Sequence, residues 1–266
     1  MNLFLRELAA YRKSTLIWAA SLGGLVVLFM ALYPGFSSDV QALKNVLEQF
    51  PAAIKAAFNL NAETFLSAAG FYGYVLSFGI LAAAIQAMNL GTGVMSKEVA
   101  GKTADFLLSK PVTRTRVIVA KLLAVLVAIV ITNVVFAAVS YVGLAAMAPD
   151  EFTGKTILLL ASTVFFVQLV FVALGAFMGV VLPKVKSVVA VSLPTVFGFY
   201  IIGALGDVLG NDEVRYASPF RYFEPEYIIK NQALEPKFLI IEAGIVVVAL
   251  ALCYVIFLKK DVRSST

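Results

Sequence analysis

Six long apolar blocks separated by polar segments dominate the pattern of this 266-residue chain. The blocks cover residues 16–32, 71–95, 117–147, 156–182, 187–209 and 238–258. Each is long enough for a helix to cross a hydrocarbon core about 30 Å thick. The blocks are apolar on all sides, unlike the alternating segments of a membrane β-barrel. We therefore predict six transmembrane helices, whose backbone groups are hydrogen-bonded internally.

Prolines indicate where several of these helices stop. We expect Pro34-Gly35 to end the first helix, Pro149 to close the third and Pro183 to stop the fourth, because proline cannot donate the next backbone hydrogen bond. Pro194 lies inside the fifth block and should kink it. The first block is longer than the core of a signal peptide and no small-residue cleavage pattern follows it, so we expect a retained span.

Two amphipathic stretches lie between the first and second blocks. Apolar residues recur at helical spacing over residues 40–50 and again over 54–58. We predict short helices packed on the outer ends of the spans, and the alternative is a mobile loop.

The distribution of Lys and Arg predicts the orientation of the chain. With six spans, both termini share one side of the membrane, and that side carries two thirds of the 21 basic residues. Because positive residues are retained on the cytoplasmic side, we expect cytoplasmic termini in the cell membrane, with residues 34–70 and 210–237 outside. The basic residues follow this topology and form no motif typical of nucleic-acid binding.

The composition limits the kinds of catalytic and metal-binding site that this chain could form. The chain is 61% hydrophobic and 14% charged, has no His, and has one Cys, Cys253, inside the last block. This excludes intrachain disulfides, His- or Cys-based metal sites and His-based catalytic triads. Two Gly-Lys-Thr triplets lack the earlier Gly of a phosphate-binding loop, since Ser96 and Pro149 stand at those positions. We expect no enzymatic activity and no cofactor on this chain.

Few polar side chains lie inside the blocks. The four amide residues among them are Gln86, Asn89, Asn133 and Gln168. They are candidates for lining a weakly polar translocation path, and the alternative is interhelical hydrogen bonding worth about 0.6–2 kcal/mol each. The charged residues Lys121, Asp207 and Glu242 fall near block ends, where we expect them to reach water.

The loop after the second block, residues 96–116, carries the most specific motif. The pattern of residues from Thr103 to Ser109 predicts a short amphipathic helix, with Thr103 as N-cap and Pro111 beyond its end. Its apolar face consists of Phe106, Leu107 and Leu108, and the basic residues around it are Lys102, Lys110, Arg114 and Arg116. From the residues alone, such a helix could lie on anionic lipid.

This loop resembles that of type 2 ATP-binding-cassette (ABC) exporter permeases, in which Glu, Gly-x-Thr, Leu-Leu, Pro-Val and Ser/Thr-Arg follow the second span. The matching residues are Glu98, Gly101, Thr103, Leu107, Leu108, Pro111, Val112, Thr113 and Arg114, with Lys121 as a basic residue further on. Residues 51–70 and Ser218-Pro219-Phe220 also resemble elements of the family. Lys102 and Asp105 depart from it, because many relatives carry less charged residues there.

The resemblance implies one all-α transmembrane domain over residues 1–266, with an N-terminal amphipathic interfacial helix at Met1–Lys13. It also implies that the 96–116 loop holds a coupling helix that docks on an ATPase subunit. The residues implied in that coupling are Glu98, Gly101, Thr103, Phe106, Leu107, Leu108, Pro111 and Arg114.

The function implied by the resemblance is that of an exporter permease in contact with membrane lipid. Two copies, most simply a homodimer, would pair with two separate ATPase subunits, which would bind ATP and Mg. The alternatives from other classes are an ion-coupled secondary transporter and a non-transporting membrane scaffold. An ion-coupled carrier usually displays an intramembrane carboxylate or paired broken helices, and we find no such pattern.

Overall fold

The computed structural model describes residues 3–38, 45–51, 54–55, 68–100, 113–147 and 153–259. Within these residues the chain is helical and has no strands. The long helices are α1 (Leu3–Ser38), α5 (Ala68–Ala100), α7 (Arg114–Met147), α8 (Gly154–Val181), α9 (Val188–Leu209) and α11 (Pro236–Lys259). All six are long and apolar enough to cross a membrane, which confirms the predicted six-span, all-α fold.

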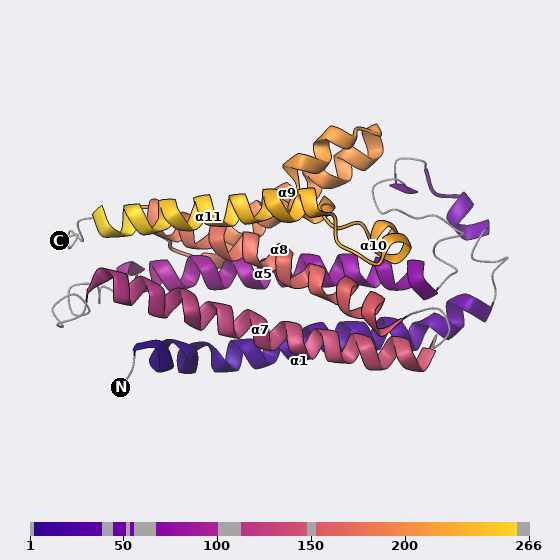
Figure 1. Cartoon of the computed structure of the whole chain (residues 1–266), viewed down its shortest axis with the longest axis horizontal. Helices are drawn as coiled ribbons and strands as arrows, with labels where there is room; N and C mark the ends of the chain where they lie inside the picture. Colours follow the sequence, from indigo (N-terminus) through magenta and orange to yellow (C-terminus); the bar gives the residue numbers. More distant parts are fainter. Residues whose placement is uncertain are drawn as a thin grey trace.

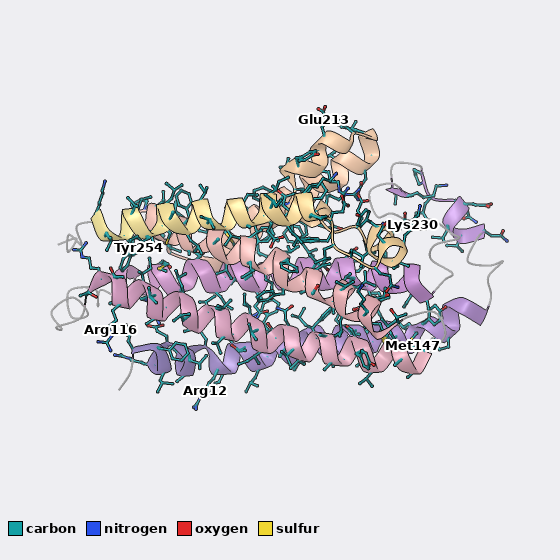
Figure 2. All side chains as sticks on the ribbon, in the orientation of Figure 1. Arg12, Arg116, Met147, Glu213, Lys230 and Tyr254 are labelled. Atoms are coloured by element: carbon teal, nitrogen blue, oxygen red, sulfur yellow. The ribbon has the colours of Figure 1, made fainter. Side chains whose placement is uncertain are left out.

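The six helices form an elongated bundle (Figure 1). The start of α1 and the end of α11 lie at the same end of it, as an even number of spans requires. Arg12, Arg116 and Tyr254 lie toward this end, which we call the basic end, whereas Met147, Glu213 and Lys230 lie toward the opposite, distal end (Figure 2). The distal end carries three short helices, η1 (Asp212–Ala217), η2 (Pro219–Arg221) and α10 (Pro225–Asn231).

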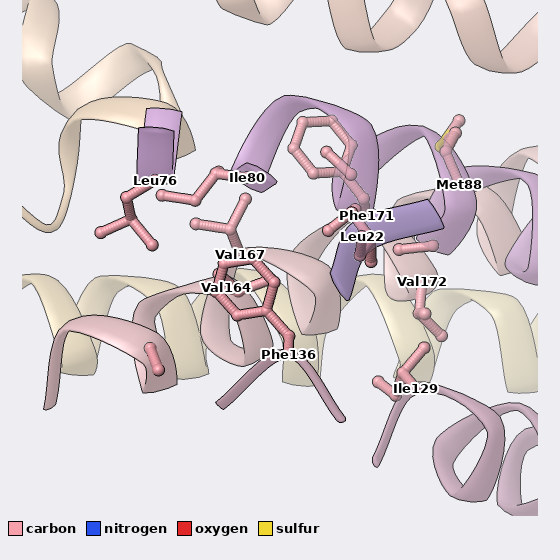
Figure 3. Packing of buried hydrophobic residues seen from close by; sticks show 14 of the residues in the cluster. Leu22, Leu76, Ile80, Met88, Ile129, Phe136, Val164, Val167, Phe171 and Val172 are labelled. Carbon is pink, nitrogen blue, oxygen red and sulfur yellow. The ribbon is translucent and has the colours of Figure 1, made fainter. Parts of the chain in front are cut away.

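The core of the bundle is centred on α5 and α8, which pack against each other more extensively than any other pair of described elements. Helix α1 packs along α7, and α11 packs along α8. Phe136 of α7 and Phe171 of α8 are completely buried in this core (Figure 3). Gly91, Gly175 and Gly179 lie where the backbones of α5 and α8 approach each other, and a side chain there would collide with the neighbouring helix. Small residues at such contacts let membrane helices pack closely.

Side chains cap several of the helix ends. Thr153 accepts a hydrogen bond from the backbone N–H of Thr156 at the start of α8, and Ser187 accepts one from Ala190 at the start of α9. These caps satisfy N–H groups that have no partner within the helix. Helix α9 includes Pro194, as expected, and ends at Gly210 in the left-handed conformation, with φ of 61°.

Helix α1 differs from the prediction at both ends. Residues 3–13 are helical, but they form the first turns of α1 and not a separate N-terminal helix. At the other end α1 continues through Pro34 to Ser38, so the expectation that Pro34-Gly35 ends this helix is wrong. A proline inside a helix removes one backbone hydrogen bond, and the helix can continue when later residues still find their partners.

The amphipathic stretches between the first two spans are described only in part. Residues 45–48 form a helical turn, within which Leu47 is buried. Most of residues 40–58 lie outside the described part of the chain, so the predicted packing of short helices there stays a prediction.

Candidate functional site

The predicted coupling loop is described only at its two flanking helices. Gly101, Thr103, Phe106, Leu107, Leu108 and Pro111 lie outside the described residues. Helix α5 continues to Ala100, five residues beyond the predicted end of the second span, so residues 96–100 belong to the helix. Glu98 therefore lies on the last turn of α5, although its side chain is outside the described part. Arg114 is the first residue of α7.

The helix that follows the loop is capped by Thr113. The hydroxyl of Thr113 accepts a hydrogen bond from the backbone N–H of Arg116 at 3.3 Å, and its carbonyl accepts one from Val117 at 3.2 Å. A Ser or Thr immediately before a helix is a typical N-cap, and the sequence contains this signal. Thr113 thus fixes where α7 begins.

The first turn of α7 is also fastened to the last turns of α11. The Arg114 guanidinium donates to the carbonyl oxygen of Leu258 at 2.9 Å, and the hydroxyls of Thr115 and Tyr254 are 3.0 Å apart. An arginine at the carboxyl end of a helix can donate to an otherwise unpaired carbonyl, and its positive charge interacts favourably with the helix dipole. The helix that follows the loop is therefore held against α11 at the basic end.

A cluster of charges joins α1, α5 and α7 at the same end. Glu7 of α1 forms an ion pair with Lys97 of α5, and its other carboxylate oxygen lies 3.8 Å from the ammonium of Lys121 of α7. Lys121 also donates to the carbonyl oxygen of Val94 at 2.6 Å. The ammonium of Lys97 lies 5.3 Å from the ring centre of Tyr11. We call Glu7, Lys97 and Lys121 the inner charge cluster.

Two charged residues are more buried than the sequence suggested. Lys121 is only 1% exposed and Glu242 only 3%, so the expectation that both reach water is wrong within this chain. Their positions near block ends were read correctly, but neighbouring helices cover them, and this depends on tertiary packing. Lys121 has partners in the inner charge cluster, whereas Oε2 of Glu242 has no hydrogen-bond partner among the described residues.

Three of the four predicted amide residues meet inside the bundle. Gln168 of α8 accepts a hydrogen bond from Asn133 of α7 at 2.5 Å, and it donates to Gln86 of α5 and to the carbonyl of Ala83, both at 3.1 Å. Gln86 and Gln168 are fully buried. Asn89 takes no part in these hydrogen bonds, and its side-chain amide oxygen has no partner among the described residues. The geometry is that of interhelical hydrogen bonds joining α5, α7 and α8.

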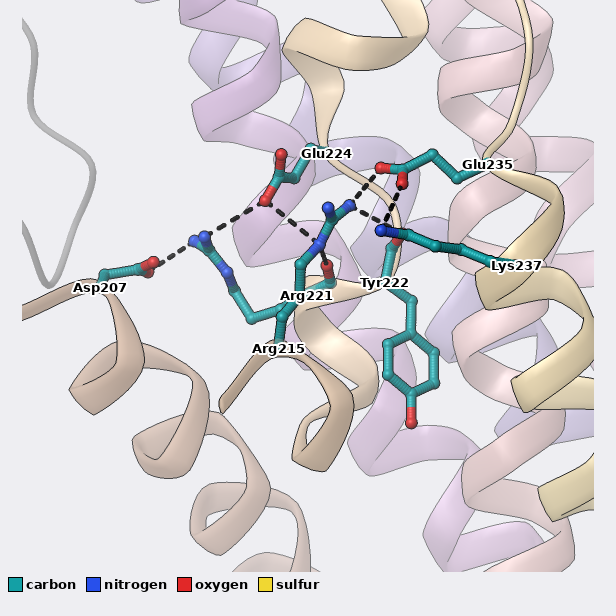
Figure 4. A network of polar contacts seen from close by, with 7 residues as sticks. All are labelled: Asp207, Arg215, Arg221, Tyr222, Glu224, Glu235 and Lys237. Atoms are coloured by element: carbon teal, nitrogen blue, oxygen red, sulfur yellow. Dashed lines mark hydrogen bonds and ion pairs between the residues drawn. The ribbon is translucent and has the colours of Figure 1, made fainter. Parts of the chain in front are cut away.

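An ion-pair network at the distal end was not recognised from the sequence (Figure 4). Arg215 pairs with Glu235 and, at 3.3 Å, with Glu224. Arg221 pairs with Asp207 of α9 at 2.6 Å and with Glu224 at 3.4 Å. Acidic and basic residues are interspersed between residues 207 and 237 in the sequence, which is the signal that could have suggested such a network.

Aromatic packing supports this distal network. The Arg215 guanidinium lies 4.2 Å from the ring centre of Phe238, and the rings of Phe238 and Tyr222 stack with centres 5.2 Å apart. Burial raises the pKa of the Tyr222 hydroxyl above its usual range, and the charge of Glu242 adds to the rise. The Tyr222 hydroxyl donates to the carbonyl oxygen of Tyr216 at 3.0 Å.

The described residues offer no metal site of the usual kind. In the part of the chain that the structure describes, no three His, Cys, Asp or Glu residues gather closely enough to hold an ion. The charges of the distal network are satisfied by each other. The arrangement thus fixes helices and short connections relative to one another.

A comparison with family models gives a match that extends over residues 1–262. The matching family is described as ABC-2 family transporter protein. Comparisons with curated proteins and with solved structures give no match. The match covers all six long helices and both ends of the predicted coupling loop.

Proposed function

This chain belongs to the ABC-2 transporter family and is a multi-pass permease component of an ABC transporter, and we propose that it exports its cargo by coupling to separate ATPase subunits through residues 96–116. The match over residues 1–262 is the observation that carries the proposal, because it includes this loop together with all the spans. The Glu98, Gly101, Leu107 and Arg114 motif supports the same assignment by resemblance.

The surroundings of the loop support a mechanical role for it. The helix before the loop is tied to α1 through Lys97, and the helix after it is tied to α11 through Arg114. A displacement of the loop would therefore act on four helices of the bundle at once. Rigid elements with such links are the means by which a local movement becomes a rearrangement of a whole domain.

ATP hydrolysis is assigned to the partner in this proposal. Both Gly-Lys-Thr triplets of the chain lack the upstream glycine of a phosphate-binding loop. The partner ATPase would bind ATP and Mg, and its closure would move the loop of each permease copy. The chain would contribute the path for the cargo and the surface that receives the ATPase.

We propose further that two copies of the chain pair in the cell membrane, with both termini in the cytoplasm. By the predicted topology, two thirds of the Lys and Arg residues in the sequence belong to the side of the two termini, as expected for the cytoplasmic side. Helices α9 and α11 leave most of their apolar surface uncovered by the rest of the chain. That surface is available to lipid and to a second copy.

The test is co-purification with an ATPase subunit encoded beside this chain. The two polypeptides should purify together from membranes, and the ATPase activity should respond to transport only when both are present. Isolated permease should hydrolyse no ATP. A chain that transports its cargo on an ion gradient without any ATPase would contradict the proposal and support the secondary-transporter alternative.

A further inference from the structure

The inner charge cluster contains one carboxylate shared by two ammonium groups. Glu7 is 4% exposed and is the residue of α1 that contacts both cations. Lys97 is partly open to solvent, with 35% of its side chain exposed, whereas Lys121 is almost completely enclosed. The two cations thus differ in how much each depends on Glu7.

The enclosed cation depends on the carboxylate most strongly. A buried charge without an opposite charge is very unfavourable, and removing one partner of a buried pair leaves the other uncompensated. Glu7 is one acidic group that pairs with Lys121, and the carbonyl of Val94 supplies a further acceptor. The ion pair with Lys121 thus links Glu7 of α1 to an enclosed position on α7.

Lys97, the partly exposed cation, lies directly beside the loop. Lys97 is on the last turn of α5, four residues before Gly101, and it stays near α1 through Glu7 and the ring of Tyr11. Lys121 is two turns into α7 on the other side of the loop. The single carboxylate of Glu7 thus connects the helix before the loop and the helix after it to the same point on α1.

We propose that Glu7 is a positioning residue for coupling, through which a displacement of the 96–116 loop moves α1 together with α5 and α7. This inference rests on the proposed coupling function of the loop. Glu7 acts through Lys97 and Lys121 and contacts neither cargo nor nucleotide. Its effect is to keep the start of α1 in register with both helices that flank the loop.

The test uses the full chain assembled with its ATPase in lipid nanodiscs. Lys97→Gln breaks the partly exposed ion pair with Glu7 and leaves the buried pair of Glu7 with Lys121 in place, so the chain should fold normally. The double variant Glu7→Gln with Lys121→Met removes both charges of this buried pair together, so that neither is left without the other. Arg6→Gln, at an exposed position beside Glu7, is the matched control, and Lys97→Arg is the conservative variant.

We expect both disruptive variants to assemble with the ATPase and to melt near the wild-type temperature. The stimulation of ATPase activity by the assembled permease, measured against the isolated ATPase, should fall by about fivefold or more in each, the size of a typical coupling between sites. Lys97→Arg should regain most of the stimulation, and Arg6→Gln should retain it. A purely structural role predicts instead that coupling follows thermal stability and is normal in a stable double variant.

Normal stimulation in both Lys97→Gln and the double variant would overturn the inference. Failure of the proposed function is seen separately, in a wild-type chain that neither binds nor stimulates the ATPase. Failure of this inference alone is seen in a wild-type complex that couples and in disruptive variants that couple equally well.

Discussion

Gly175 of α8 lies so close to Met88 of α5 that a Cβ atom on the glycine would stand 2.7 Å from the Met88 carbonyl oxygen. It would also stand 2.9 Å from the backbone nitrogen of Thr92. Both obstacles are backbone atoms, which cannot turn aside as a flexible side chain can. The close packing of α8 against α5 therefore requires a residue without a side chain at position 175.

The first prediction concerns this contact. Gly175→Ala should lower the free energy of unfolding by about 1–3 kcal/mol, because α5 and α8 must move apart to admit the methyl group. Gly244→Ala on α11 is the matched control, since nothing lies within 4 Å of its added Cβ. The control should be neutral or stabilising by up to about 1 kcal/mol, because alanine favours helix. Thermal unfolding in detergent compares the two, and equal melting temperatures would contradict the prediction.

The second prediction concerns the distal network. Arg215→Ala should destabilise the chain by about 1.5–3 kcal/mol, because Glu235 is nearly buried and loses a charged hydrogen-bond partner. Arg215→Lys should recover only part of this, since lysine lacks the planar fork that reaches several acceptors. Lys230→Ala, at an exposed position nearby, is the control. Limited proteolysis of residues 210–237 measures the effect, and wild-type resistance in Arg215→Ala would be evidence against it.

The third prediction separates the two readings of the buried amides. Gln168→Leu should lower stability by about 1–3 kcal/mol, because Asn133 and Gln86 each lose a buried hydrogen-bond partner. We expect the rate of transport per folded complex to stay close to that of the wild type. A variant of unchanged stability with altered cargo preference would instead place these residues on the translocation path. Melting curves and transport assays on the same preparation decide between the readings.

The fourth prediction concerns orientation. Asn231→Cys at the distal end should react with an impermeant maleimide in intact cells, whereas Lys186→Cys at the basic end should react only after permeabilisation. Both positions are exposed in the structure. The native Cys253 is completely buried and should contribute little background. The reverse pattern of labelling would invert the proposed topology.

The sequence predicted the elements of this fold better than their contacts. The six spans follow from local hydrophobicity, which the sequence displays directly. The continuation of α1 through Pro34 was not predicted, because proline weakens a helix without always ending it. The burial of Lys121 and Glu242 was not predicted either, since it depends on which helices pack beside α7 and α11.

For the candidate site residues, too, the sequence predicted the residues better than the contacts between them. The composition of the blocks singled out Gln86, Asn133 and Gln168, but only the packing of α5, α7 and α8 shows that these three meet while Asn89 does not. Glu7 was not predicted as a site residue, because its two partners are about 90 and 114 residues away along the chain. Long-range pairs of this kind are not visible in local patterns.

The central claim is that residues 96–116 couple this permease to its ATPase, and the most direct measurement is on the loop itself. Phe106→Ala, Leu107→Ala and Arg114→Ala are each purified with the ATPase, with Lys230→Ala at the distal end as control. Complex yield and cargo-stimulated ATPase activity are measured together. Truncating a central interface aromatic typically costs about 2 kcal/mol or more, so Phe106→Ala should assemble poorly and couple weakly although its spans insert normally. Full assembly and full coupling in all three loop variants would contradict the account and leave this loop as a segment held only by lipid.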